Sequence, residues 1–121
     1  MSTTATGYRK LSIVIPAFNS SGWITQCLEH LSVALKNAQI SDAEVIVVDD
    51  GSTDGTGQEA QRFPGLPIHL VSQENQGRFL ARENGLAKCS GSHVLFLDTR
   101  VFLAETSLTF VLPFLNEANS S

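Results

Sequence analysis

Four short apolar runs recur along the chain, and each is followed by turn residues. The runs are rich in β-branched and aromatic residues, a composition that predicts strands. They cover residues 11–15, 44–48, 68–71 and 94–97. The second and fourth runs are almost continuously apolar, which is typical of strands covered on both faces in a parallel sheet.

Helical patterns separate these runs. After Ser20 and Ser21, which we predict to cap a helix, apolar residues recur at three- and four-residue spacing up to about Asn37. A second helix is predicted over residues 54–63. Because two glycines near its start each cost about 1 kcal/mol relative to alanine, this helix should be short and frayed.

Two further helices are predicted towards the end of the chain. One covers residues 76–89 and is expected to turn Leu80, Leu86 and Ala87 towards the core. The other covers residues 106–115 and should end or break near its proline. The strand–helix alternation therefore predicts an α/β fold with a doubly wound, mostly parallel sheet and right-handed crossovers.

Length and composition favour one compact domain. The chain has 121 residues, of which 42% are hydrophobic and 17% charged, and this balance excludes a disordered chain. We predict that the domain covers residues 11–115, between flexible tails at 1–10 and 116–121. Its apolar stretches are far shorter than the roughly 18 to 20 residues that cross a bilayer, and no basic N-terminal region precedes an apolar run. We therefore predict no transmembrane segment and a cytoplasmic location.

Charge and cysteine content exclude two further classes of site. The formal net charge is −4 and no basic run is present, so nucleic acid is not an expected partner. Cys27 and Cys89 lack the spacing of a metal or redox motif, and we predict that both are reduced core residues.

Acidic residues follow two of the predicted strands. Ligands of doubly wound sheets bind beyond the carboxyl ends of the strands, so Asp49, Asp50 and Asp98 are candidate ligand contacts. A carboxylate there can accept hydrogen bonds from a nucleobase imide or from ribose hydroxyls. Alternatively, Asp49 and Asp50 cap the turn and the following helix, and Asp98 is an ordinary turn residue. The residues alone leave both interpretations open.

Several motifs together resemble one family. They are PAFN at 16–19, VVDDGSTDGT at 47–56, NQG at 75–77, ARENG at 81–85 and FLDTR at 96–100. In this order and spacing they resemble the nucleotide-sugar-binding half of the family 2 inverting glycosyltransferases, which have the GT-A fold. The resemblance covers about residues 11–115, and VVDDGSTDGT is its most specific part. It implies transfer of a sugar from a nucleoside diphosphate sugar, commonly a UDP-sugar, to an acceptor that the sequence does not identify.

The resemblance also implies roles for individual positions. The acidic pair would hold the base and ribose, and the first Asp of the family's D-x-D motif would bind Mg²⁺ or Mn²⁺ at the diphosphate. The nucleotide-binding residues that it implies are Pro16, Ala17, Asn19, Asp49, Asp50, Gly77, Arg82 and Asp98, with Asp98 also as the metal ligand.

Two departures from the family pattern bear on function. Arg100 stands where the second Asp of D-x-D is expected, and a guanidinium cannot ligate a cation, which places the metal in doubt. Arg100 either points into the site and pairs with the diphosphate or turns outwards to solvent. No residue matches the family's general base, so we expect the isolated chain to bind donor but to be incomplete for transfer. The very apolar segment 102–114 is expected to contact a missing C-terminal half or a second copy of the chain.

Two other functions are considered. A non-catalytic nucleotide-sugar-binding module would have the same fold and the same missing base. A receiver-like signalling domain has a similar length and an acidic pair, but that pair follows the first strand, whereas here it follows the second. This position disfavours the signalling function.

Overall fold

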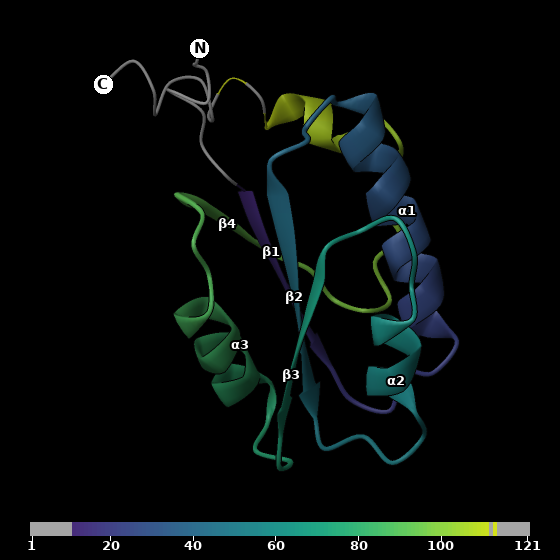
Figure 1. Cartoon of the computed structure of the whole chain (residues 1–121), viewed down its shortest axis with the longest axis vertical. Helices are drawn as coiled ribbons and strands as arrows, with labels where there is room; N and C mark the ends of the chain where they lie inside the picture. Colours follow the sequence, from purple (N-terminus) through teal and green to yellow (C-terminus); the bar gives the residue numbers. More distant parts are fainter. Residues whose placement is uncertain (1–10, 112, 114–121) are drawn as a thin grey trace.

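The computed structural model describes residues 11–111 and residue 113 (Figure 1). The tails predicted at 1–10 and 116–121 lie outside the described residues. The elements follow in the order β1 (Leu11–Ala17), α1 (Trp23–Asn37), β2 (Ala43–Asp50), α2 (Thr56–Gln61), β3 (Ile68–Gln73), α3 (Arg78–Ala87), β4 (His93–Phe96) and the 3₁₀ helix η1 (Ser107–Phe110). Each of the four predicted strands is present, and β1, β2 and β3 each extend two residues beyond the predicted end.

The strands form one parallel sheet in the order β3-β2-β1-β4. The chain first runs from β1 outwards to β3, with α1 and α2 on one face, and then returns across the sheet to β4 through α3 on the other face (Figure 1). A reversal of direction that moves the helix to the opposite face is what right-handed crossovers require. The predicted doubly wound α/β fold is confirmed.

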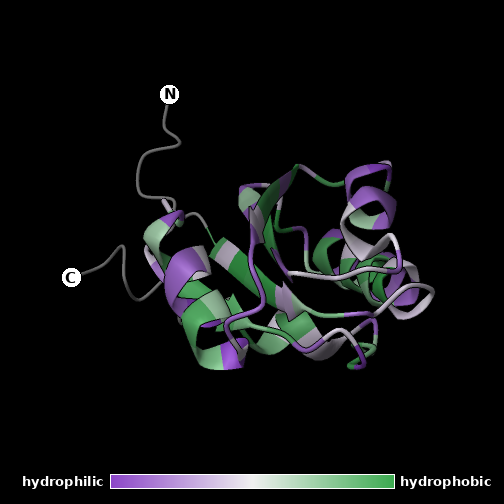
Figure 2. Cartoon of the chain, turned by 90° about the horizontal axis from the view of Figure 1, so that it is seen from below, coloured by the Kyte–Doolittle hydropathy of each residue, from purple (hydrophilic) through white to green (hydrophobic). Residues whose placement is uncertain are grey.

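Alternate residues of the two central strands supply two separate cores. Ile13 and Val45 pack with α1, whereas Val14, Ile46 and Val48 pack with Ala81 of α3, and all six are buried. Figure 2 shows the hydrophobic strands between α3 on one side and α1 and α2 on the other. Because successive strand side chains point to opposite faces, a continuous apolar run is needed where both faces are covered.

Helix α3 lies close to the sheet because Gly85 faces it. A Cβ atom at Gly85 would lie 2.5 Å from Cγ1 of Val14 and 3.0 Å from Cγ2 of Val48. The predicted inward positions of Leu80, Leu86 and Ala87 are wrong, because the small residues Ala81 and Gly85 occupy the contact face and the larger apolar side chains are exposed. The close approach of α3 to the sheet leaves room on the contact face for small residues only.

Helix boundaries differ from the predictions in three places. Helix α1 begins after Gly22, which has φ 85° and no capping side chain, so the predicted caps at Ser20 and Ser21 are wrong. Helices α2 and α3 are each shorter at both ends than predicted, and they start later because Gly55 and Gly77, both with positive φ, precede their first turns. In the region 106–115, η1 is a 3₁₀ helix, and residues 112, 114 and 115 lie outside the described part.

No helix in the described part of the chain has the length and apolar character needed to span a bilayer.

Candidate functional site

A cavity of about 500 Å³ opens at the carboxyl edge of the sheet. Its walls come from the ends of β1, β2 and β4 and from the start of α3, which is where a doubly wound sheet binds ligands. The lining residues are Pro16, Ala17, Phe18, Ser20, Asp50, Asn75, Gly77, Arg78, Ala81, Asp98, Thr99 and Arg100.

Pro16 helps to open this cavity. The backbone oxygen of Val14 accepts a hydrogen bond from the N–H of Leu97, so the backbone groups of Val14 and Pro16 face the β4 side of the sheet. The pairing of β1 with β4 ends at the register Val14–Phe96, so no strand lies beside Pro16 on that side. A residue without an N–H is tolerated at such a position, and the sheet gains an open edge.

Asp50 is the most constrained acidic group of the cavity. Its Oδ1 accepts hydrogen bonds from Gln73 Nε2 at 2.8 Å and from the backbone N–H of Gln76 at 2.7 Å. Its Oδ2 accepts one from the N–H of Gly77 at 3.0 Å, which leaves that oxygen with one acceptor position. Burial raises the pKa of this carboxyl, but the three donated hydrogen bonds outweigh burial and lower the pKa below its ordinary value. Asp50 is therefore an ionised acceptor aimed at the cavity.

Gly51 lets two loops meet around Asp50. Its φ is 79°, and a Cβ atom there would lie 2.7 Å from the backbone nitrogen of Asn75. Asn75 in turn donates from Nδ2 to the backbone oxygen of Asp50 at 3.0 Å. The glycine in VVDDGSTDGT is thus required both by its left-handed backbone and by the close approach of the 74–77 loop.

The turn after β4 is tied to the end of β1. The N–H of Val101 donates to the backbone oxygen of Asp98, and the N–H of Arg100 donates to Asp98 Oδ1 at 2.9 Å. Buried Thr99 donates from Oγ1 to Ser20 Oγ at 3.0 Å. These contacts hold the Asp98-Thr99-Arg100 turn in one orientation at the rim of the cavity.

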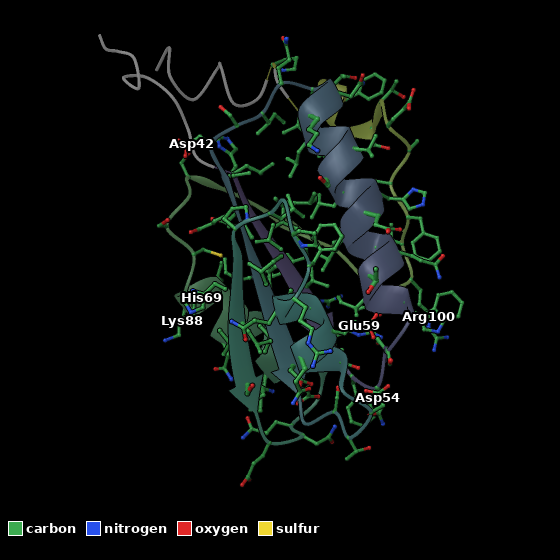
Figure 3. All side chains as sticks on the ribbon, turned by 45° about the vertical axis from the view of Figure 1, so that its right-hand side comes forward. Asp42, Asp54, Glu59, His69, Lys88 and Arg100 are labelled. Carbon is green, nitrogen blue, oxygen red and sulfur yellow. The ribbon has the colours of Figure 1, made fainter. Side chains whose placement is uncertain are left out.

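Two arginines near Asp98 make different contacts. Arg78 Nη2 lies 3.5 Å from Asp98 Oδ2, and the two side chains are 66% and 40% exposed, so the ion pair is screened by solvent and weak. The guanidinium of Arg100 lies over the Trp23 ring, 5.0 Å from its centroid, and Trp23 stacks on Phe102. Figure 3 shows Arg100 beside the first turn of α1.

Five of the residues predicted from the sequence are brought together in this cavity, and three are not. Those that line it are Pro16, Ala17, Asp50, Gly77 and Asp98. The other three make contacts elsewhere. Asn19 accepts a hydrogen bond from the N–H of Thr53, and Asp49 accepts one from the N–H of Ser52 and lies against α2. The guanidinium of Arg82 lies 5.9 Å from the Phe96 ring centroid. Nucleotide contacts by these three residues stay predictions.

Asp49 and Asp50 illustrate why sequence alone could not separate the pair. They are consecutive in β2 and so point to opposite faces of the sheet, Asp49 towards α2 and Asp50 towards the cavity. The immediately preceding residues of β2 are apolar and buried on both faces, so they gave no signal for which carboxylate faces the cavity. In the turn after β4, Thr99 is buried and lines the cavity, and the motifs did not identify it as a lining residue.

The start of α1 beside the cavity is capped by another helix. Glu59 of α2 accepts hydrogen bonds from the N–H of Gly22 at 3.0 Å and from the hydroxyls of Ser21 and Thr25. Burial raises the pKa of Glu59, but these donors outweigh it and lower the pKa below its ordinary value. A carboxylate at a helix N-terminus also interacts favourably with the helix dipole.

Replacing Glu59 with Gln is expected to lower the free energy of unfolding by about 1 kcal/mol at pH 7, the usual contribution of a helix cap. Because the folded pKa is depressed, the carboxylate stabilises the fold above the unfolded pKa, and this contribution is lost as pH falls through the folded pKa. Urea unfolding at pH 7 and below pH ~4 should therefore show the difference between wild type and Glu59→Gln shrinking in acid. Glu29→Gln, an exposed change on α1, is the matched control, and an equal difference at both pH values would contradict the prediction.

The side chains of the cavity do not suit a divalent cation by themselves. Mg²⁺ prefers about six oxygen ligands. No group of three or more His, Cys, Asp or Glu side chains within residues 11–111 could hold a metal ion. Asp50 already accepts three hydrogen bonds, and Asp98 accepts one from the backbone N–H of Arg100 and forms an ion pair with Arg78. The described residues do not form a cation site of their own.

Comparison with known proteins decides the family. A sequence model described as Glycosyl transferase family 2 matches residues 12–120, which is nearly the whole chain. The chain belongs to this family. The resemblance drawn from the motifs is thereby confirmed.

Relatives of this family 2 glycosyltransferase chain are much longer. It is 33% identical over 93 residues to glycosyltransferase GlyA of Streptococcus pneumoniae, covering 74% of this chain and 13% of GlyA. Crystal structures of Staphylococcus aureus TarS 1–349 in complex with UDP and with UDP-GlcNAc match with TM-score 0.78 and 30% identity, covering 89% of this chain and 32% and 31% of theirs. The mannosyltransferase PcManGT from Pyrobaculum calidifontis in complex with GDP-Man and Mn²⁺ matches with TM-score 0.79 and 25% identity, covering 89% of this chain and 32% of that one. The chain thus spans a third or less of these relatives.

Proposed function

We propose that the cavity binds the nucleoside diphosphate part of a sugar donor and that this chain supplies the donor site of a glycosyltransferase. The observation that carries the proposal is Asp50, an ionised acceptor with one open position on Oδ2, set among the 74–77 loop and the end of β1. An imide N–H of a nucleobase or a ribose hydroxyl fits such an acceptor. The family and the TarS complexes with UDP and UDP-GlcNAc support a nucleotide sugar as the ligand.

The nucleobase of the donor is to be identified by experiment. Uracil and guanine both carry an imide-type N–H beside a carbonyl, and the similar structures contain UDP in one case and GDP-Man in another. We favour a uridine nucleotide because TarS shares more identity with this chain than PcManGT does.

Transfer requires a base that deprotonates the acceptor hydroxyl, a contribution of about 10²- to 10⁴-fold. The resemblance matches no residue of this chain to that base. We therefore propose that these residues bind the donor and that the base and acceptor site are supplied by additional protein. A binding module without transfer would share the donor site, and an assay for sugar transfer distinguishes the two functions.

Isothermal titration calorimetry of the chain with UDP, UDP-GlcNAc and GDP, each with Mn²⁺ present, tests the donor site. We expect saturable 1:1 binding of UDP and displacement of UDP by UDP-GlcNAc. Adenosine diphosphate, whose base has no imide N–H, is the control and should bind more weakly. Failure of UDP and of GDP to bind at millimolar concentration would contradict the proposed function.

A further inference from the structure

The charges around Asp98 differ from those that suit a divalent cation. The Asp98 carboxylate forms an ion pair with the Arg78 guanidinium, Arg100 follows in the same turn, and all three residues line the cavity. Cations repel a further cation but attract a diphosphate. The local field at this rim therefore favours an anion more than a metal ion.

Arg100 is held in a way that leaves its donors available. The carbon of its guanidinium lies over the ring of Trp23, 5.0 Å from the ring centroid, which is a cation–π contact. A cation–π contact depends on the charge of the group and not on conventional hydrogen bonds from its five N–H donors. No hydrogen bond or ion pair joins this guanidinium to another residue in the part of the chain that the structure describes.

The backbone below Arg100 is fixed as well. Its N–H is bound to Asp98 Oδ1, and the neighbouring Thr99 is buried and bound to Ser20. A side chain held both at its backbone and by contact with an aromatic ring loses little further freedom when it binds a ligand. Arg100 is thus preorganised at the rim of the cavity.

Arg78 can bind a phosphate oxygen beside Arg100. Its ion pair with Asp98 spans 3.5 Å between two exposed side chains, and such pairs contribute little to stability. The pairing can therefore be exchanged for a phosphate oxygen at low cost. Arg78 is also the first residue of α3, whose N-terminus lies at the cavity.

We propose that Arg100, together with Arg78, binds the diphosphate of the nucleotide directly, so that nucleotide affinity in this chain does not depend on a divalent cation. The inference rests on the proposed function of the cavity and concerns the phosphate end of the same site. Guanidinium groups bind phosphate oxygens bidentately, which supplies both charge neutralisation and geometry. The proposal predicts a nucleotide complex that needs no divalent cation, whereas the complex of PcManGT with GDP-Man contains Mn²⁺.

The first test is calorimetric titration of the full chain with UDP in the presence of Mn²⁺ and, separately, of EDTA. We expect the two dissociation constants to agree within about twofold. An affinity that falls tenfold or more in EDTA overturns the inference and leaves the proposed function intact. Absence of binding of UDP and GDP under both conditions overturns the proposed function, and the inference with it.

Variants test the assigned residue. Arg100→Gln should weaken UDP binding about tenfold or more in EDTA, the loss expected for one charge-assisted contact, and should leave uridine binding unchanged because uridine has no phosphate. Arg100→Lys, which keeps the charge but not the planar fork, should lie between wild type and Arg100→Gln. Arg100→Asp should bind UDP poorly in EDTA and recover affinity with Mn²⁺.

Arg62→Gln is the matched control, because it removes an exposed guanidinium from the end of α2, outside this cavity. It should bind UDP as wild type does. Equal affinity of wild type and Arg100→Gln for UDP, or an equal loss of UDP and uridine affinity in Arg100→Gln, overturns the inference.

Discussion

Asp50→Ala is expected to reduce UDP affinity at least about tenfold and to lower the free energy of unfolding by about 2 to 3 kcal/mol. Asp50 is 5% exposed, and its carboxylate accepts three hydrogen bonds, two of them from the backbone of the 74–77 loop. Its loss leaves those N–H groups without their acceptor and removes the acceptor position that faces the cavity. Calorimetric titration with UDP and urea unfolding at pH 7 measure the two effects.

Asp50→Asn separates the two effects. An amide oxygen can take the place of Oδ1, which accepts two bonds, whereas the NH₂ group at Oδ2 opposes the N–H of Gly77 and cannot accept from a ligand. Asp50→Asn should therefore keep more stability than Asp50→Ala but lose as much UDP affinity. Asp42→Ala is the charge-matched control, since Asp42 lies at the opposite end of the sheet (Figure 3). Wild-type UDP affinity in both Asp50 variants would contradict the assignment.

The sheet was predictable because its signal is local. Continuous apolar runs bounded by turn residues identified the strands, and the alternation with helical stretches identified the doubly wound order. Helix ends were less predictable, because their caps come from elsewhere in the chain. The N-terminus of α1 is satisfied by Glu59, which is 37 residues from Gly22, and no local pattern indicates such a contact.

The site was predictable to the level of its loops but not of each side chain. Strand ends in a parallel sheet converge, so the sequence pattern alone could group Pro16, Asp50 and Asp98 at one edge. Which member of a consecutive pair faces the ligand depends on register. The position of Arg100 depends on its contact with Trp23, 77 residues away in sequence, which no spacing rule supplies.

The face of α3 that packs on the sheet was also not predictable from the sequence. A helical pattern with Leu80 and Leu86 favours an apolar face, but the two buried residues are Ala81 and Gly85. The short distance between α3 and the sheet determines which face of the helix is buried. That distance depends on the tertiary structure and not on the local sequence. The close approach of α3 to the sheet also shapes the cavity, because Arg78 and Ala81 of α3, and Gly77 directly before it, line the cavity wall.

Gly85→Leu is therefore expected to lower the free energy of unfolding by more than about 3 kcal/mol and to abolish measurable UDP binding. Overpacking a well-packed core by single methylenes costs about 1 to 3 kcal/mol, and leucine adds four carbons where a Cβ alone would lie 2.5 Å from Val14. Val14 and Val48 are fully buried in the central strands and cannot move aside, so α3 must shift away from the sheet. Urea unfolding and UDP titration measure the two losses.

Two companion variants make the Gly85 prediction specific. Gly85→Ala adds only the Cβ atom, and its packing cost is offset by about 1 kcal/mol of gained helix propensity, so its loss of stability should be much smaller than that of leucine. Glu83→Leu places the same side chain on the exposed face of α3 and should change the free energy of unfolding by about 0.5 kcal/mol or less. If Gly85→Leu were as stable as Glu83→Leu, the close contact of α3 with β1 and β2 could not be what holds the cavity wall in place.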